Sequence, residues 1–343
     1  MTALATSPVR PGLSEWAVRS ARALLLRTGI GRSHFHKQRA LRVLCYHGVC
    51  PDEVIGEPWI PDYFVSASQF AEQMAYLKEL GPILDLVDAV EALDRGDMRS
   101  DSCTAITFDD VAACSFVHAA PVLETLGIQA AFFVATGPAS SGRLFPADVL
   151  ALTALYATDP DCPASPAVRQ LIDHPALHKR MPIEDVTSAL ADVEVWLRET
   201  LDEEIIANLR AMNWREVAEL AQMGHAVGPH TVDHAILGWQ QTRTRRSQIS
   251  ESVDEVATRI GAAPICFAYP NGGPGDFGEP DERALRRAGV RFAFSTRAGF
   301  CTPATDLLAL PRICIGKYHT LEKFALEVSG LLDRRRRRQQ GWN

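Results

Sequence analysis

Short apolar runs alternate with longer amphipathic stretches along most of the chain. The apolar runs have the length of buried strands and end at turn residues or charged residues. The segments that this pattern predicts as strands are 41–46, 82–86, 104–108, 130–134, 224–228, 265–269, 291–295 and 308–315. Apolar residues recur at helical spacing in the segments 14–27, 70–80, 87–94, 117–126, 184–200, 213–222, 247–260, 281–288 and 322–332. Such alternation is typical of a parallel sheet covered by helices, so it predicts an α/β fold.

The strand pattern is absent between about residues 138 and 222. Prolines divide this part into stretches of helical character, and they stand at positions 160, 163, 166, 175 and 182. We therefore expect a mostly helical insertion between two repeats of one domain that covers 41–330. The insertion is expected to overhang the active face and influence substrate choice, or else only to decorate the rim. Residues 1–40 are predicted to be a tail and a helix, and 331–343 a basic tail.

Composition adds limits on class and partners. The 343 residues are 47% hydrophobic and 22% charged, which is ordinary for a soluble globular protein with a large core. The net charge of −7 gives no reason to expect a nucleic acid as partner. The eight cysteines contain no C-x-x-C pair and several lie in apolar runs, so we expect reduced thiols in the core.

The chain has no apolar run of 18 residues, so we expect no transmembrane helix. It also lacks the apolar region of a signal peptide, which points to a cytoplasmic location. The helix 14–27 interleaves arginines with Trp16 and leucines, and Arg334–Arg338 is a basic run. Either could contact an anionic membrane surface, although a packed helix and a solvated tail are the simpler interpretations. The sequence does not indicate the oligomeric state.

Candidate chemistry follows two of the predicted strands. Asp109 and Asp110 end the strand 104–108, while His230 and His234 lie four residues apart after a short strand. One carboxylate and two imidazoles form a set suited to a catalytic divalent metal with a position left for water. The other carboxylate would then be a general base. The simpler alternatives are a helix cap or a solvated loop for the aspartates, and structural or surface roles for the histidines.

The residues of these segments resemble a known family. Thr107–Asp110, His230–His234 and Phe267–Gly272 look like the first three motifs of polysaccharide deacetylases, the family with the NodB homology domain. Three shorter segments also resemble the family, namely Tyr46–Val49, Phe132–Gly137 and Leu310–Ile313. All the matching segments follow one another in the order found in the family, from about residue 41 to 330. The resemblance implies a distorted (β/α)7 TIM-like barrel and hydrolysis of the N-acetyl group, less often an O-acetyl group, of a sugar.

The resemblance also implies roles for individual residues. Asp110, His230 and His234 correspond to the metal ligands, and Asp109 corresponds to the general base. The metal is usually zinc, with cobalt, nickel or another divalent ion as alternatives. Positions expected to contact or support the substrate are Thr231, Tyr269, Pro270, Asn271 and Gly272. A backbone N–H in the turn 270–273 could stabilise the oxyanion that forms when water attacks the acetyl carbonyl.

The chain departs from the family pattern at several positions. Val111 replaces a glycine, with a strained or altered loop expected if the backbone there needs a positive φ, and Ala112 replaces an aromatic residue. Ala268 replaces an arginine that orients the base, and we expect Arg312 to supply that guanidinium instead. The late histidine motif is not recognisable, which leaves His47, His319 or water as the general acid.

Two functions therefore remain open at the level of sequence. The first is an N-deacetylase acting on a glycan, a lipid- or nucleotide-linked precursor or a natural-product intermediate. The second is a catalytically impaired relative that binds carbohydrate without turnover.

Overall fold

The structure is a computed structural model that describes residues 29–97 and 102–331. The predicted helix 14–27 and the run Arg334–Arg338 lie outside these residues. Within the described ranges, none of the helices combines the length and the apolar character that crossing a bilayer requires. No disulfide joins the cysteines of the described residues.

Five parallel strands form the main sheet, in the order β6-β5-β4-β1-β9. Their bounds are Ala40–Tyr46 (β1), Ser102–Asp109 (β4), Ala130–Val134 (β5), Ala226–Pro229 (β6) and Ile313–Cys314 (β9). Every residue of β1, β4 and β5 is buried, which explains why most of their residues are apolar. Two parallel pairs stand beside the sheet: β2 (Val49–Cys50) with β3 (Val65–Ser66), and β7 (Cys266–Ala268) with β8 (Phe292–Phe294).

The strands follow one another around an open and distorted barrel. Gly228 of β6 lies so close to β7 that a Cβ atom there would come within 2.8 Å of the Cys266 carbonyl oxygen. A parallel bridge from Phe294 to Leu310 leads from β8 towards β9. In the described residues no ladder of hydrogen bonds joins β6 to β7, so the barrel is not continuously closed. The predicted α/β fold class, a distorted barrel with a helical insertion, is confirmed.

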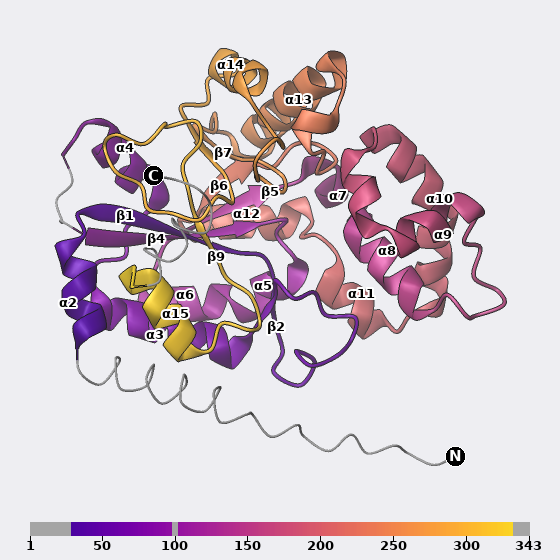
Figure 1. Ribbon diagram of the computed structural model, residues 1–343, viewed down its shortest axis with the longest axis horizontal. Coiled ribbons are helices and arrows are strands. Elements are labelled where there is room, and N and C mark those ends of the chain that lie inside the picture. The colour runs from indigo at the N-terminus through magenta and orange to yellow at the C-terminus, as the bar shows by residue number, and fades with distance from the viewer. Residues whose placement is uncertain (1–28, 98–101, 332–343) are drawn as a thin grey trace.

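Successive side chains of the central strands face opposite sides, as β geometry requires. Leu44, Ile106 and Phe132 pack against outer helices, whereas Val43 and Phe133 face β7 and β8 inside the barrel. The outer helices in this packing are α2 (Ile30–Lys37), α3 (Ala67–Leu80), α6 (Ala120–Leu126) and α15 (Leu321–Ser329). On the other side of the sheet lie α4 (Leu86–Asp94), α13 (Thr242–Ile260) and α14 (Glu279–Arg287) (Figure 1).

Local signals account for several helix ends. The Ser66 Oγ atom accepts a hydrogen bond from the Gln69 N–H at 3.2 Å and so caps α3. The predicted strand 82–86 is reduced to a single bridge between Ile83 and Thr104. The reason is that the Asp85 carboxylate caps α4, so that the helix already begins at Leu86.

The segment between β5 and β6 is helical throughout its regular structure. It contains α7 (Thr136–Ser141), α8 (Pro146–Leu155), α9 (Pro166–Asp173), η1 (Pro175–Arg180), α10 (Ile183–Thr200), α11 (Glu203–Leu209) and α12 (Trp214–Gln222). Three of these elements begin with proline, which suits the first turn of a helix because its missing N–H would have no partner there. Helices α8 to α11 form a group beside the barrel (Figure 1), and their apolar side chains share one hydrophobic cluster with the loop between β2 and β3.

Candidate active site

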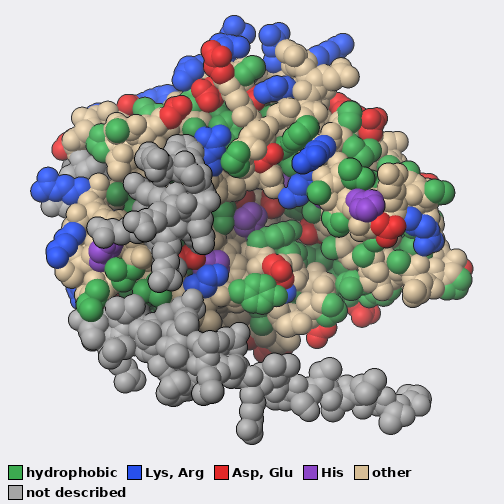
Figure 2. Space-filling model, in the orientation of Figure 1, with side chains coloured by type: hydrophobic (Ala, Val, Ile, Leu, Met, Phe, Trp, Pro, Cys, Tyr) green, Lys and Arg blue, Asp and Glu red, His purple; other side chains and the backbone are tan. Residues whose placement is uncertain are grey.

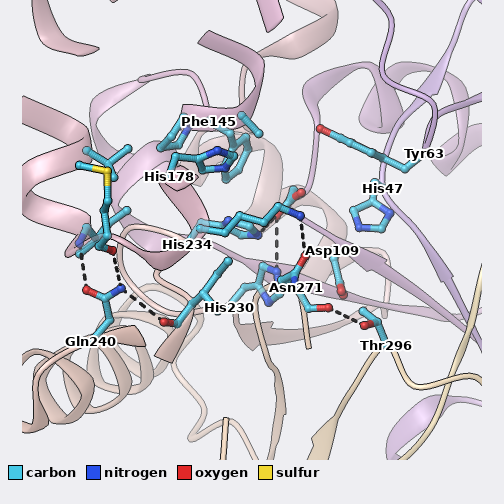
Figure 3. Close-up of a pocket in the computed structure, with 18 residues that line it drawn as sticks. His47, Tyr63, Asp109, Phe145, His178, His230, His234, Gln240, Asn271 and Thr296 are labelled. Atoms are coloured by element: carbon cyan, nitrogen blue, oxygen red, sulfur yellow. Dashed lines mark hydrogen bonds and ion pairs between the residues drawn. The ribbon is translucent and has the colours of Figure 1, made fainter. Parts of the chain in front are cut away.

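A cavity of about 290 Å³ lies between the carboxyl ends of the barrel strands and the helical insertion. The strand ends supply its polar wall, which includes His47, Asp109, Asp110, His230, His234, Asn271 and Thr296. The insertion supplies a largely apolar wall from Phe145 to Ala147 and from Met181 to Val186. Figure 2 shows a hollow on this face beside the insertion, and Figure 3 shows the lining side chains. Sites of parallel barrels gather at this end of the strands.

The backbone around the polar wall is strained. All non-glycine residues with a positive φ in the described ranges belong to it, namely Asp110 (61°), Val111 (58°), Thr231 (64°), His234 (57°) and Asn271 (59°). Such strain costs about 1–3 kcal/mol per residue and is concentrated at functional sites. The region therefore has the backbone character of an active site.

The loop after β4 keeps a left-handed backbone even though Val111 replaces the expected glycine. The Val111 N–H donates to the Asp109 carbonyl at 2.6 Å, which closes a tight turn around Asp110. The Val111 carbonyl accepts from the Met212 N–H at 2.8 Å, and its side chain is almost fully buried in the core. The expectation of a strained loop thus describes this turn, and packing and hydrogen bonds hold it in place.

Asp110, His230 and His234 converge on one point. The Asp110 Oδ1 atom lies 3.1 Å from His234 Nε2 and 3.5 Å from His230 Nε2. The His230 Nδ1–H donates to the Ala268 carbonyl at 2.7 Å, so the lone pair of neutral His230 is on Nε2 and faces the carboxylate. Asp110 Oδ1 is buried and accepts no hydrogen bond of normal geometry from the described residues.

This arrangement fits a bound cation. Acceptor atoms that face one another without a proton between them repel unless a positive charge lies among them. Burial raises the pKa of Asp110, but His234 and His230 lower it more strongly, so that it lies well below its usual value. Burial lowers the pKa of His230, and Asp109 and Asp110 outweigh that effect and raise it. The three side chains could hold a metal ion.

Asp109 is held by a buried guanidinium. Arg312 Nη1 donates to Asp109 Oδ1 at 2.7 Å and Nη2 to Oδ2 at 2.5 Å, and both side chains are almost completely buried. The same guanidinium donates to the Ser295 carbonyl and the Thr107 hydroxyl, which fixes its plane. Burial raises the pKa of Asp109, but Arg312 and then His230 lower it further, so the carboxylate is the favoured form. Arg312 thus holds the Asp109 carboxylate, the contact expected of the residue that supplies the guanidinium in place of Ala268.

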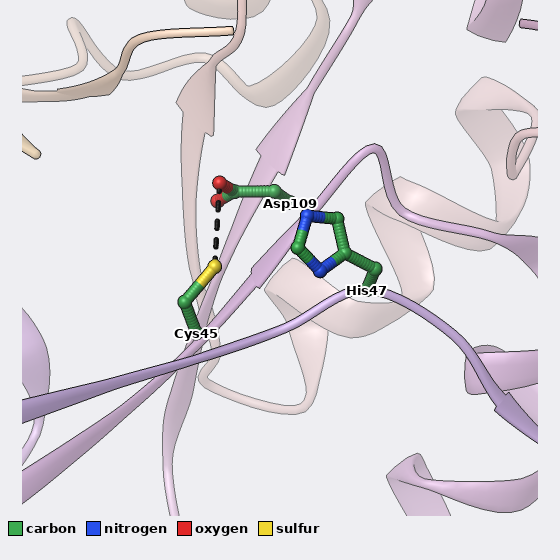
Figure 4. Close-up of side chains that lie close together, drawn as sticks. All are labelled: Cys45, His47 and Asp109. Carbon is green, nitrogen blue, oxygen red and sulfur yellow. Dashed lines mark hydrogen bonds between the residues drawn. The ribbon is translucent and has the colours of Figure 1, made fainter. Parts of the chain in front are cut away.

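Cys45 is a second group that contacts Asp109. Its thiol donates to Asp109 Oδ2 at 3.4 Å, and His47 stands beside the pair (Figure 4). The ligand atoms of Cys45, His47 and Asp109 are close enough to hold a second metal. The Arg312 cation already neutralises that carboxylate, so we interpret the thiol as a support for Asp109.

His47 lines the cavity and has a ring nitrogen without a partner. Its buried Nδ1 atom has no hydrogen-bond partner in the described residues, and its ring lies 4.9 Å from that of Tyr63. Burial lowers the pKa of His47, against the opposing influence of Asp110 and Asp109. His319 does not line the cavity; its Nε2 atom lies 3.1 Å from the Glu327 carboxylate. Of the two histidines considered as general acid, only His47 is in reach of the site.

One of the expected substrate contacts lies on the cavity wall, and the contacts with substrate stay a prediction. Asn271 lines the cavity, whereas Thr231, Tyr269, Pro270 and Gly272 do not. Thr231 is buried and its hydroxyl accepts from the Ala235 N–H, while the Tyr269 hydroxyl donates to the Leu308 carbonyl. The N–H groups of Gly272 and Gly273 already donate to Pro270 and Asp276. Within the described residues the Asn271 N–H has no acceptor, so it is the donor of this turn that remains for an oxyanion.

Several lining residues have no sequence signal. Tyr63 lies in the loop between β2 and β3, and its hydroxyl donates to the Asp148 carboxylate of α8 at 2.9 Å. Burial raises the pKa of Asp148 to about 7, with Tyr63 lowering and Asp110 raising it. His178 and Lys179 come from η1 of the insertion. No motif or periodicity marks any of these residues, because their position depends on how the insertion packs on the barrel.

Two carboxylates and two imidazoles lie together at the carboxyl ends of parallel strands. This arrangement is typical of a barrel hydrolase with a metal centre. Residues 96–293 match the family model described as polysaccharide deacetylase. The chain belongs to the polysaccharide deacetylase family, and the predicted enzyme class, a hydrolase acting on the amide bonds of N-acetylated sugars, is confirmed. The matched range contains Asp109, Asp110, His230 and His234 but neither His47 nor Arg312.

Solved structures share the fold. The Streptococcus pyogenes deacetylase PplD in complex with acetate is 17% identical, with a TM-score of 0.57 over 84% of this chain and 98% of that one. IcaB from Ammonifex degensii is 20% identical, with a TM-score of 0.56 over 85% and 97%. The de-N-acetylase from Aggregatibacter actinomycetemcomitans is 14% identical, with a TM-score of 0.54 over 83% and 99%. No curated protein sequence matches the chain significantly.

Proposed function

We propose that the protein is a metal-dependent N-deacetylase of an amino sugar. The observation that carries this proposal is the convergence of Asp110 Oδ1 with the two imidazole Nε2 atoms, beside a second carboxylate that a guanidinium holds in place. Asp110, His230 and His234 would hold the metal, with zinc favoured by the two-imidazole, one-carboxylate set and cobalt or nickel as alternatives. A divalent ion there supplies Lewis acidity towards water and towards the acetyl carbonyl.

The chain itself supplies the proton transfers. Asp109 takes a proton from the attacking water, and Arg312 keeps its carboxylate ionised and oriented. His47, whose ring lines the cavity, gives a proton to the nitrogen of the amide as the bond to the acetyl carbon breaks. The Asn271 N–H donates to the carbonyl oxygen while it carries negative charge. Acetate and a free amino sugar leave.

The cavity supports a substrate that enters by one sugar ring. Its volume of about 290 Å³ lies at the lower end for ligand sites, and the insertion covers one side of it. The apolar wall around Phe145 offers a surface for the acetyl methyl group or for the apolar face of the ring. A terminal or isolated N-acetylated sugar therefore fits better than an internal residue of a long polymer.

The test is acetate release from a panel of N-acetylated sugars by protein prepared with and without zinc. We expect metal-dependent release that falls by at least about 1,000-fold in Asp109→Asn, since a base and its charge are both lost. Asp94→Asn is the matched control, because Asp94 lies on the surface beside Arg291 and far from the cavity lining. Sugar binding without metal-dependent release on a broad panel would instead support a binding protein.

A further inference from the structure

A lysine from the insertion reaches across the cavity. Lys179 belongs to η1, and its Nζ atom donates to the Asn271 side-chain oxygen at 2.9 Å, a contact drawn at Asn271 in Figure 3. The two residues are 92 positions apart in the chain. Among the described residues that line the cavity, Lys179 is the only lysine or arginine. The contact places a positive charge opposite the strand ends that carry the candidate metal ligands.

The acceptor of this bond is rigidly held. The Asn271 Nδ2–H donates to Asp276 Oδ2 at 2.5 Å, so the amide is oriented with Oδ1 towards Lys179. The Thr296 hydroxyl donates to the Asn271 backbone carbonyl at 2.5 Å, which fixes the main chain of the same residue. Asn271 therefore presents a fixed oxygen to the ammonium group of Lys179, which is an exposed residue.

The ammonium group has donor capacity left over. An ammonium carries three N–H donors, and Asn271 uses one of them. Lys179 forms no ion pair with a carboxylate of the described residues. Two acids of the site are already engaged, since Arg312 neutralises Asp109 and two imidazoles face Asp110. A positioned cation with free donors at a substrate cavity is suited to an anionic oxygen group.

From these contacts we propose that the substrate carries an anionic group, a phosphate or a carboxylate, on the sugar that bears its acetamido group, and that Lys179 binds it. The inference rests on the proposed function, because it names the class of sugar that the same cavity takes. Asn271 holds the ammonium in place, and the remaining N–H donors bind the anion. Lys179 is thus a specificity-determining residue that the strand-end motifs do not contain.

The test compares three N-acetylglucosamine derivatives: the 1-phosphate, the 6-carboxylate (uronic acid) and the neutral methyl glycoside. We expect wild-type kcat/KM to favour one of the anionic sugars, and Lys179→Met to lower that value by about 10-fold to 100-fold, as for a charged hydrogen bond. The methyl glycoside should change by less than about 2-fold, and Lys179→Arg should retain part of the preference. Whichever anionic sugar responds identifies the group as phosphate or carboxylate.

Arg180→Met is the matched control. Arg180 is the next cation along η1, but it lies over the Trp239 ring at 5.2 Å and does not line the cavity. We expect this variant to keep the preference for the anionic sugar. Equal losses on the neutral and anionic sugars in Lys179→Met would overturn the proposal and assign Lys179 to closing the cavity. No preference in the wild-type enzyme would also overturn it while leaving the deacetylase function intact.

Binding separates the two conclusions if no sugar is turned over. Calorimetric titration of wild-type protein and Lys179→Met with the sugar 1-phosphate and the uronic acid needs no catalysis. Binding that weakens about 10-fold or more in the variant supports the anion site even if the deacetylase proposal fails. Equal affinity of both proteins, or no binding, overturns the anion site.

Discussion

The bidentate pair between Arg312 and Asp109 leads to a prediction about pH. Arg312→Lys keeps the positive charge but removes the planar fork that matches both carboxylate oxygens. A lysine ammonium in this space can retain one contact to Asp109 but cannot also satisfy the Ser295 carbonyl and the Thr107 hydroxyl. The carboxylate of the variant should therefore be less well stabilised than in the wild-type protein.

The size of the effect follows from the bonds that are lost. One charge-assisted hydrogen bond contributes about 1.5–3 kcal/mol, which corresponds to about one to two pKa units. The Asp109 pKa is lowered in the folded protein, so its stabilisation is present above the ordinary carboxyl pKa and disappears as pH falls through the folded value. In Arg312→Lys that loss begins at higher pH. We expect the acid limb of kcat/KM to move up by about one to two pH units and the unfolding free energy to fall by about 2–4 kcal/mol.

The assay is acetate release by the zinc-loaded enzyme as a function of pH, together with urea denaturation at neutral pH. Arg291→Lys is the control, because Arg291 makes a similar forked contact to Glu91 and Asp94 at a surface where its side chain is 47% exposed. The control should change stability by less than about 1 kcal/mol and leave the pH profile in place. A profile of Arg312→Lys that superimposes on the wild type would refute the role given to the guanidinium.

Three further outcomes are expected. His234→Ala should lower zinc affinity by more than about 100-fold in equilibrium dialysis, because the loss of a direct ligand weakens binding more than the loss of a residue outside the ligand set. His178→Ala, which changes a cavity residue outside the ligand set, should alter the affinity only a few-fold. Val111→Gly should lower the unfolding free energy by about 1–2 kcal/mol in urea, because lost burial and added backbone entropy exceed the relief of a left-handed valine; a stabilised variant would reverse that ranking. Asp148 binds its proton more tightly in the folded protein than in the unfolded chain, so its contribution to stability is lost as the pH rises. Between pH 5 and 7 the unfolding free energy of the wild type should fall by about 2–3 kcal/mol relative to that of Asp148→Asn. Equal pH dependence of the two unfolding free energies would contradict the raised pKa.

The paired carboxylates were predictable because sequence order fixes their place in a parallel sheet. Tyr46 pairs with Phe108 across β1 and β4, so the residues that follow, His47 and Asp109, meet at the same edge. The histidines follow β6 in the same way, two strands from β4. The contact between Arg312 and Asp109 joins residues 203 positions apart. It was expected only from the family resemblance, because Ala268 stands where an arginine orients the base.

The substrate contacts were not predictable at this level of detail. Ala268 faces the barrel interior, so the next side chain, Tyr269, points to the opposite side and packs on Phe277. The motif names the segment but does not say which of its side chains reaches the cavity. Lys179 and Asp148 depend on the packing of helices whose prolines and apolar spacing predict only that they are helices.

The hydrophobic cluster of the insertion is distinct from the clusters that hold the barrel strands, and it also includes residues of the loop between β2 and β3. Leu152, Val186 and Leu190 pack with one another, whereas the strands that carry Asp110 and His230 draw on the clusters of the barrel. Partial unfolding of the insertion should therefore admit solvent and large ligands to the cavity while the strand ends keep their positions. Substitutions in α8 to α10 can then alter which sugars bind while the positions of Asp109, Asp110 and the two histidines stay the same. In such an architecture substrate range can diversify over evolution while the chemistry is conserved.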